Sequence, residues 1–163
     1  MSFSKVKSYA KINLALNVTG KLKKLHKIES IVSFINLHDL IFISRTKDKN
    51  HKISFYGNFS KSIRKNNTVK KLFEILDDNK LLRNKKFKVK IKKNIPQRAG
   101  LGGGSMNAAN ILNFLIKKKF VKINKKKLYK ISSLIGSDVI LGINSQCTIL
   151  KSNNDIKKFS NCP

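Results

Sequence analysis

The sequence predicts an α+β fold, and three observations support that class. Alternating apolar and polar residues, the pattern of half-buried strands, dominate the first third of the chain. Apolar residues at helical spacing dominate the second half, so strands and helices follow one another in uneven order. At 163 residues the chain is long enough for one buried core, and no repeat or glycine/serine linker divides it. We therefore expect a single domain over residues 1–163.

The first strand is expected over residues 10–18, where apolar and polar side chains alternate. A period of two places Lys11 and Asn13 together on one face of this strand. By residue type alone, Lys11 would be a solvated lysine. The opposite face is expected to enter the core, and it consists of Ile12, Leu14, Leu16 and Val18.

Further strands are predicted over residues 28–36, 39–45 and 52–57, with a polar turn between the last two. Together with the first strand they favour an antiparallel meander. Another strand is expected over residues 86–92, where lysines occupy one face and Pro96 stops the strand. Its apolar face consists of Phe87, Val89 and Ile91.

Three helices are expected from apolar residues at helical spacing. The first covers residues 67–76, the second follows a run of glycines, and the third ends at Gly136. Closing strands are expected over residues 138–143 and 146–150. The apolar faces of the three helices are formed by Val69, Leu72, Phe73 and Leu76, by Ala108, Ala109, Leu112, Leu115 and Ile116, and by Leu128, Ile131, Leu134 and Ile135.

The chain is strongly basic, with 36 lysines and arginines against 8 acids and a net charge of +28. Such a charge favours nucleic acid or an anionic surface as a partner. The lysines, however, are spread over nearly every segment, which favours a general drift in composition and only weak, nonspecific attraction to polyanions. No apolar run reaches the length of a membrane span, and Cys147 and Cys162 form no paired motif. A cytoplasmic protein is therefore expected.

Four of the eight glycines lie within residues 100–104, between a predicted strand and a predicted helix. That order directs free backbone N–H groups and the positive end of a helix dipole at one spot. Glycines let a phosphate approach these amides without a β-carbon in the way. Ser105 can add a hydroxyl contact or cap the helix itself. The stretch therefore predicts a phosphate-binding loop.

Two common nucleotide loops are excluded by the residues around these glycines. No lysine follows the glycines, which excludes the G-x-x-x-x-G-K-[ST] loop. Ser105 takes the last position of a G-x-G-x-x-G motif, and no acid occurs over residues 79–137 to hold a ribose. Asp138 is the only carboxylate between Asp78 and Asp155, and its position after a turn is typical of a capping residue or of a side chain that faces a cleft.

Three segments, YAKINLALNVTG, IPQRAGLGGGSMNAA and IGSDVILG, carry a family resemblance from about residue 8 to about residue 150. In this order they resemble the N-terminal motifs of the 4-diphosphocytidyl-2-C-methyl-D-erythritol kinase family, part of the galactokinase, homoserine kinase, mevalonate kinase and phosphomevalonate kinase (GHMP) superfamily. The resemblance implies the ribosomal protein S5 domain 2-like fold of a GHMP kinase N-terminal domain. It also implies ATP as phosphoryl donor, with Mg²⁺ carried by the ATP, and the 2-hydroxyl of a cytidine-diphosphate-linked methylerythritol as acceptor in non-mevalonate isoprenoid synthesis.

The resemblance also implies roles for individual residues. Lys11 and Asp138 match the catalytic pair, and Asn13 and His26 match residues that contact the substrate. The chemistry suits them, because Asp138 can accept the hydroxyl proton while Lys11 keeps that carboxylate ionised. The expected ATP-binding residues are Asn67, Pro96, Gln97, Arg98, Ala99, Gly100, Leu101, Gly102, Gly103, Gly104, Ser105 and Met106.

The chain departs from the family pattern at several positions. Leu25 replaces an aromatic residue that can stack on cytosine, and Met106 replaces a second serine. Gln97 and Arg98 replace small residues, and Arg98 can add a phosphate contact. The family's C-terminal domain is not found before Pro163, so a fragment or an eroded gene product is expected.

Two other functions stay open at this point, and the oligomeric state is open as well. One is a basic RNA-binding or scaffold domain on the same fold, which the charge favours but the scarcity of aromatics among the lysines opposes. The other is a different small-molecule kinase of the GHMP superfamily.

Overall fold

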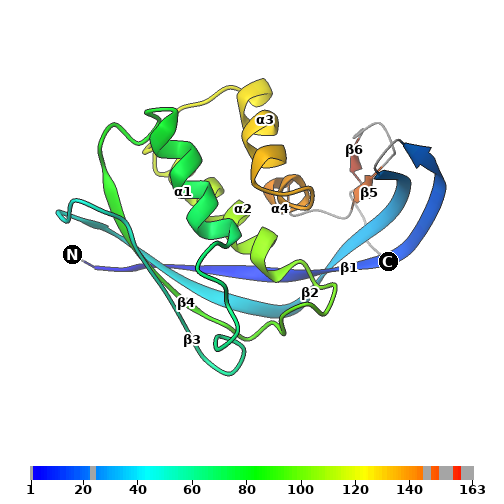
Figure 1. Cartoon of the computed structure of the whole chain (residues 1–163), viewed down its shortest axis with the longest axis horizontal. Coiled ribbons are helices and arrows are strands. Elements are labelled where there is room, and N and C mark those ends of the chain that lie inside the picture. The colour runs from blue at the N-terminus through cyan, green and yellow to red at the C-terminus, as the bar shows by residue number, and fades with distance from the viewer. Residues whose placement is uncertain (1, 23–24, 145–147, 151–155, 159–163) are drawn as a thin grey trace.

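The computed structural model describes residues 2–22, 25–144, 148–150 and 156–158. These residues form a six-stranded sheet and four helices, and the helices lie together on one side of the sheet (Figure 1). Along the main path the strand order is β3-β4-β2-β5-β6, with β1 paired to β2. This is a two-layer α+β arrangement, as predicted. Within the described residues no helix is long and apolar enough to cross a membrane.

The two longest strands form one extended hairpin. β1 (Ser4–Leu22) pairs antiparallel with β2 (Leu25–Thr46) along its whole length. The predicted strands 28–36 and 39–45 are therefore one strand. The register between Tyr9–His38 and Ala10–Ile35 shifts by two residues, and this irregularity separates the two halves of β2.

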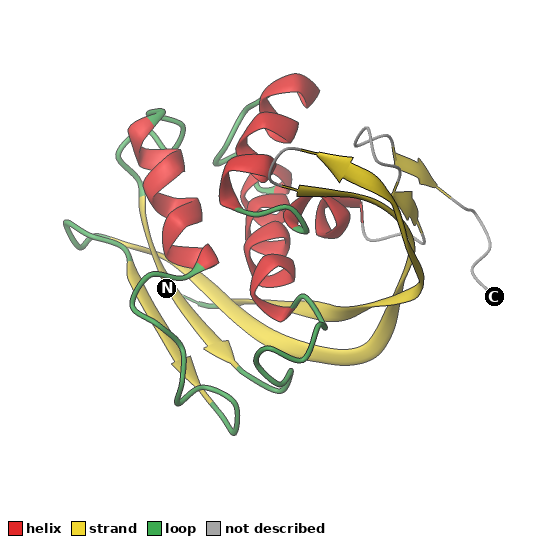
Figure 2. Ribbon diagram, turned by 45° about the vertical axis from the view of Figure 1, so that its right-hand side comes forward, coloured by secondary structure: helices red, strands yellow, loops and turns green. Residues whose placement is uncertain are grey.

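The distal half of this hairpin extends past the helices and bends toward the side of the sheet on which they lie (Figure 2). Here the expectation of a buried apolar face was wrong. Leu14 and Leu16 are 50% exposed and Val18 is 60% exposed. Their alternation correctly indicated a strand, but among the described residues the helices cover the paired strand only at Val32, which packs against Met106 of α2 and Leu141 of α4, and leave these three side chains exposed. By contrast, Ile41 and Ile43 on the proximal half of β2 are fully buried beneath the helices.

The strands β3 (Lys52–Tyr56) and β4 (Lys86–Lys92) complete the proximal sheet. β4 pairs antiparallel with β2, whereas β3 pairs parallel with β4. The expected antiparallel meander was thus wrong for β3, because its partner arrives later in the sequence. The apolar face of β4 is buried as predicted, and its lysines lie on the opposite face. Nζ of Lys90 there lies 5.4 Å from the centre of the Phe3 ring.

Helices α1 (Thr68–Asp78) and α2 (Gly103–Lys117) cover the proximal sheet. The side chain of Asn67 caps α1 by accepting hydrogen bonds from Val69 N and Lys70 N, both at 3.1 Å. The four apolar residues predicted for α1 are all buried, as are Ala108, Ala109, Leu112 and Leu115 of α2.

The C-terminal part of the described chain contains α3 (Lys125–Ile135), α4 (Val139–Asn144), β5 (Thr148–Leu150) and β6 (Ile156–Lys158). Residues 138–143 were expected as a strand, and that was wrong because they enter α4. A β-carbon at Gly142 would lie 2.6 Å from Cβ of Ala109, so glycine lets α4 approach α2 closely. α3 ends at Gly136, as predicted. The φ of Gly136 is 175°, which is extended backbone and not the left-handed conformation common at helix ends. Leu134 was expected in the core and is 50% exposed. Gln146, Cys147 and Cys162 lie outside the described residues.

Candidate active site

The glycine loop joins the end of β4 to the start of α2. The chain leaves β4 at Lys92, and α2 begins at Gly103 with Gly102 as its N-cap. Ser105 lies in the first turn, so the alternative that it caps the helix was wrong. The backbone N–H groups of this first turn precede the helical hydrogen-bond ladder, which starts when Met106 N donates to Gly102 O at 2.9 Å. Unpaired donors at a helix N-terminus suit an anion.

Two glycines of the loop lie close to neighbouring side chains, and the closer approach is at Gly102. Gly102 has φ of 65°, and a β-carbon there would lie 2.8 Å from Cγ of Lys11. Lys11 N also donates a hydrogen bond to Leu101 O at 3.0 Å, which ties the loop to β1. At Gly104, a β-carbon would lie 3.2 Å from Oγ1 of Thr68, which donates to Gly104 O at 2.7 Å. The loop is therefore held between β1 and α1.

A cavity of about 590 Å³ opens between the glycine loop and the start of α1. Gln97 donates from Nε2 to Phe59 O at 2.6 Å, and this contact joins the loop to the segment between β3 and α1. Lys93 and Asn107 also line the cavity. Its lining includes nearly all residues predicted to bind ATP, namely Asn67, Pro96, Gln97, Arg98, Ala99, Gly100, Leu101, Gly102, Gly103, Gly104 and Ser105.

Met106 is the predicted ATP-binding residue that the structure places elsewhere. Its side chain is fully buried in a small apolar cluster with Val32 and Leu141. Its backbone N–H already donates within α2. Neither group faces the cavity, so including Met106 was wrong. The helical period explains the error, because Met106, the fourth residue of α2, points away from the loop and into the core.

Lys11 and Asp138 lie 127 positions apart in the sequence and meet beside the glycine loop. Nζ of Lys11 lies 3.4 Å from Oδ2 of Asp138. The Lys11 side chain is 8% exposed and that of Asp138 is 35% exposed, so the carboxylate is the more accessible partner. The expectation that Lys11 is solvated was wrong. The loop covers its aliphatic part, and its ammonium is directed to Asp138.

The segment IGSDVILG, which carries Asp138, contacts α2 at Ser105. A β-carbon at Gly136, two residues before Asp138, would lie 3.6 Å from Oγ of Ser105. The turn that carries Asp138 therefore packs directly against the first turn of α2. All three sequence motifs therefore meet at the glycine loop and the first turn of α2.

The predicted substrate residues lie along the hairpin. Asn13 accepts hydrogen bonds at Oδ1 from Nζ of Lys11 at 3.2 Å and from Oγ of Ser30 at 3.1 Å. Ser30 also donates to Ala15 O at 2.8 Å. Asn13 is thus fixed next to Lys11. The backbone of His26 pairs with Lys21 near the hairpin tip, while its side chain lies outside the described part of the structure.

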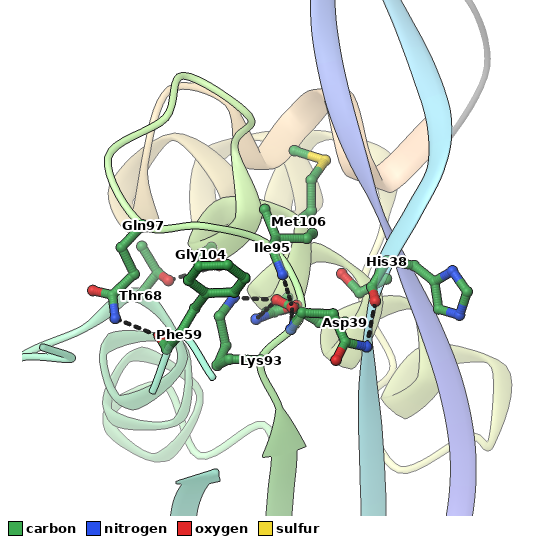
Figure 3. A network of polar contacts seen from close by, with 12 residues as sticks. His38, Asp39, Phe59, Thr68, Lys93, Ile95, Gln97, Gly104 and Met106 are labelled. Atoms are coloured by element: carbon green, nitrogen blue, oxygen red, sulfur yellow. Dashed lines mark hydrogen bonds and ion pairs between the residues drawn. The ribbon is translucent and has the colours of Figure 1, made fainter. Parts of the chain in front are cut away.

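The sequence analysis missed Asp39, which lies at the centre of the polar network in Figure 3. Its Oδ1 accepts from the backbone N of Asn94 at 2.8 Å and of Ile95 at 2.9 Å, while its Oδ2 accepts from Nδ2 of Asn107 at 2.9 Å and from Nζ of Lys93. Asp39 is fully buried. One signal was present: with only 8 acids in the chain, an acid that begins an apolar strand indicates a specific partner.

The described residues contain no group of three or more His, Cys, Asp or Glu side chains that could hold a metal ion. Donors in the region are backbone amides of the loop, the Ser105 hydroxyl and the ammonium groups of Lys11 and Lys93. Such donors suit phosphate oxygens. The fold and these donors together define an α+β domain with a candidate phosphate-binding site, and an acid–lysine pair lies beside its glycine loop.

Comparison with known proteins agrees with that class. The family model described as "GHMP kinases N terminal domain" matches residues 67–149, and the chain belongs to this family. The 4-diphosphocytidyl-2-C-methyl-D-erythritol kinase of Pelagibacter ubique (strain HTCC1062) is 63% identical over 161 residues, covering 99% of this chain and 57% of the relative. The enzyme of the same name from Petrotoga mobilis is 37% identical over 94% of this chain and 58% of its own length. The chain therefore spans somewhat more than half of these relatives.

Solved structures confirm the fold. A crystal structure of 4-(cytidine 5'-diphospho)-2C-methyl-D-erythritol kinase superposes with a TM-score of 0.75 at 21% identity, covering 96% of this chain and 55% of that one. The Methanococcus jannaschii mevalonate kinase superposes with a TM-score of 0.65 at 16% identity, covering 98% and 56%. The predicted GHMP kinase N-terminal fold is thus confirmed.

Proposed function

We propose that this chain forms the nucleotide-binding part of a kinase that transfers the γ-phosphoryl group of ATP to the 2-hydroxyl of 4-diphosphocytidyl-2-C-methyl-D-erythritol. The names of the relatives support this substrate and the isoprenoid pathway. The observation that carries the proposal is the 3.4 Å contact between Lys11 and Asp138 beside the glycine loop, whose other residues line the cavity. The proposal includes a cytoplasmic location, which rests on the two widely spaced cysteines.

Asp138 is the proposed acceptor of the hydroxyl proton. Its carboxylate is accessible enough to reach a substrate, and a general base must come within hydrogen-bond distance of the proton that it takes. Lys11 is the proposed electrostatic partner. A buried ammonium next to the carboxylate would balance negative charge that develops on the attacking oxygen.

The glycine loop is the proposed phosphate cradle. Phosphoryl transfer depends mainly on positioning and on stabilising charge, and the loop offers backbone N–H groups, the α2 dipole and the Ser105 hydroxyl. Arg98 lines the same cavity and is the proposed additional cation. Mg²⁺ would arrive with ATP, with phosphate oxygens and Ser105 as its proposed ligands, and would help neutralise the phosphate charge.

The substrate is proposed to lie along the hairpin. Asn13 is adjacent to Lys11, and the chain carries His26 farther along the same hairpin. A substrate that spanned both positions would place its methylerythritol end near Asp138 and its cytosine end near the hairpin tip. Leu25 supplies no aromatic ring for stacking, so we expect weaker base binding than an aromatic residue would give.

ADP release in the presence of the diphosphocytidyl alcohol tests the proposal. Because the chain spans 57% of the Pelagibacter relative, the assay compares the chain alone with a chimera in which it replaces the matching segment of that relative. We expect substrate-dependent turnover by the chimera and a loss of about 10²–10⁴-fold in kcat for its Asp138→Asn variant. Turnover that the substitution leaves unchanged would remove Asp138 from the role of base.

A panel of small alcohols distinguishes the proposal from other GHMP reactions. The chimera is expected to prefer the diphosphocytidyl alcohol over mevalonate and homoserine. A chimera that phosphorylated mevalonate or homoserine at least as well would contradict the assigned substrate and leave only the family.

A further inference from the structure

A fully buried acid that the proposed reaction does not use lies beneath the glycine loop. Removing a carboxylate from water costs several kcal/mol unless opposite charge and hydrogen bonds compensate. Asp39 has that compensation from four donors on two elements, the segment after β4 and helix α2 (Figure 3). Two of these donors are consecutive backbone N–H groups of Asn94 and Ile95, so the carboxylate fixes the direction in which the chain leaves β4.

The other two donors belong to side chains that line the candidate phosphate cavity. Lys93 is 4% exposed, and its Nζ would lie 3.3 Å from a β-carbon at Gly103, the first residue of α2. Asn107 is 1% exposed, and its Oδ1 has no hydrogen-bond partner within the part of the chain that the structure describes. Asp39 therefore holds two residues that line the cavity: the Lys93 side chain, whose ammonium suits phosphate oxygens, and the Asn107 side chain, whose NH₂ donates to Asp39.

Asp39 also lies at the junction between the loop and the hairpin. It follows the register shift in β2, and the half of β2 before that shift pairs with Asn13 of β1 and carries Ser30, whose Oγ donates to Asn13 Oδ1. Asn94 donates from Nδ2 to His38 O at 2.9 Å, which adds a second bond between this part of β2 and the approach to the loop. Movement of Asp39 would change the position of the loop relative to β1 and Lys11.

We propose that Asp39 is a positioning residue of the glycine loop. Its carboxylate holds Lys93, the Asn94–Ile95 backbone and Asn107 in one arrangement, and that arrangement fixes the first turn of α2 in the geometry that binds phosphate. The inference rests on the proposed function for the identity of the ligand as a nucleotide. Asp39 itself touches no reacting atom, because it is fully buried.

Backbone hydrogen exchange tests the positioning role without any ligand. The Asp39→Asn variant keeps the size of the side chain but presents an NH₂ group to Lys93 and Asn107, both of which are donors. We expect faster exchange in peptides that cover residues 94–105 and unchanged exchange in α1, because local opening follows the lost contacts. Asp77→Asn is the matched control: Asp77 pairs with Lys86 and with His51 at 3.2 Å, so its exchange effect should fall on α1 and β4.

Nucleotide affinity supplies the second readout. Calorimetry with the β,γ-imido analogue of ATP and Mg²⁺ should show a Kd that is raised about tenfold or more in Asp39→Asn. The measurement is made at a temperature where circular dichroism shows that the variant is folded. Asp77→Asn should leave that Kd unchanged. A purely structural ion pair would lower Tm in both variants and leave both Kd values alone, and that result would overturn the proposal.

Two further variants keep the test decisive. If Asp39→Asn does not fold, Asn107→Leu removes one of the four donors, and it should accelerate exchange over residues 94–105 by a smaller factor. The double variant Asp39→Asn with Asn107→Asp returns a carboxylate to the network from the opposite side, and it should recover part of the loop protection. Exchange over 94–105 that is unchanged in Asn107→Leu, or no better in the double variant than in Asp39→Asn, would contradict the role.

The two readouts separate this inference from the proposed function. If the unmodified chain fails to bind the ATP analogue while Asp39→Asn still opens the loop selectively, the nucleotide assignment is wrong and the positioning role stands. If the unmodified chain binds the analogue and Asp39→Asn changes neither exchange nor Kd, the positioning role is wrong and the nucleotide assignment stands.

Discussion

The two halves of the long hairpin differ sharply, although both are strands with alternating apolar residues. In the proximal half, Ile41 and Ile43 are buried beneath α1 and α2 and share a core with β4. In the distal half, Leu14, Leu16 and Val18 are at least half exposed. The same sequence period therefore describes a core strand in the proximal half and a largely exposed strand in the distal half. We call the distal half, which carries Leu14, Leu16 and Val18, the arm. What differs is the layer above the strand, which alternation alone does not report.

The largest expected effect contrasts the core with the arm. Phe87 is fully buried and its ring lies 5.2 Å from that of Phe120, so Phe87→Ala should lower the free energy of unfolding by about 3–5 kcal/mol. Leu16→Ala on the arm should change it by less than about 0.5 kcal/mol. Urea denaturation measures both. Equal losses would show that the arm is packed as tightly as the core, and the comparison would fail.

A second substitution tests the contact between the glycine loop and Lys11 of β1. Gly102 and Gly100 both have positive φ, 65° and 73°, but only Gly102 is crowded by Lys11 of β1. Gly102→Ala should therefore cost about 2–4 kcal/mol, from the left-handed backbone and the overpacking together. The matched control Gly100→Ala should cost about 1–2 kcal/mol, from the backbone alone. Similar losses in both variants would mean that Lys11 does not press on the loop.

A smaller effect is expected at the start of α1, which frames the cavity on the core side. Asn67→Ala removes the side chain that caps the helix and should cost about 1 kcal/mol in the absence of nucleotide. Asn66→Ala, one residue earlier and outside the cap, should lower the free energy of unfolding by only about 0.3 kcal/mol. Thermal unfolding of both variants measures the difference, and no difference would place the start of the helix elsewhere.

The smallest effect concerns pH. Burial lowers the pKa of His51 below its ordinary value of about 6.5, although Asp77 opposes the shift. The folded chain therefore binds fewer protons at His51 than the unfolded chain does. Stability from this residue is complete above about pH 6.5 and is lost as pH falls through the lower pKa of the folded state. Tm measured from pH 7.5 to pH 5 should fall less in His51→Gln than in the unmodified chain. An equal fall would assign the pH dependence to other groups.

Local structure followed from the sequence where the covering layer was implied by the same residues. The four apolar positions of α1, the alternation of β4 and the glycine loop before α2 each combine an apolar period with a clear boundary residue. The resemblance also correctly brought Lys11 and Asp138 to adjacent positions.

Other features depended on contacts between distant segments. β3 pairs with β4, which lies later in the sequence, and residues 139–144 form α4, where Gly142 packs closely against Ala109 of α2. The short apolar run there carries no period long enough to separate helix from strand. Asp39 acquires its role from Lys93 and Asn107, which lie 54 and 68 positions away.

A double-mutant cycle on the chimera tests the pairing of Lys11 and Asp138 most directly. Lys11→Met and Asp138→Asn are made singly and together, and kcat for phosphorylation of the diphosphocytidyl alcohol is measured in each. Residues that act as one unit give strongly non-additive losses, so the double variant should be no more than a few-fold slower than the worse single variant. Losses that multiply across the two substitutions would show that the lysine and the aspartate act independently, and they would contradict the account.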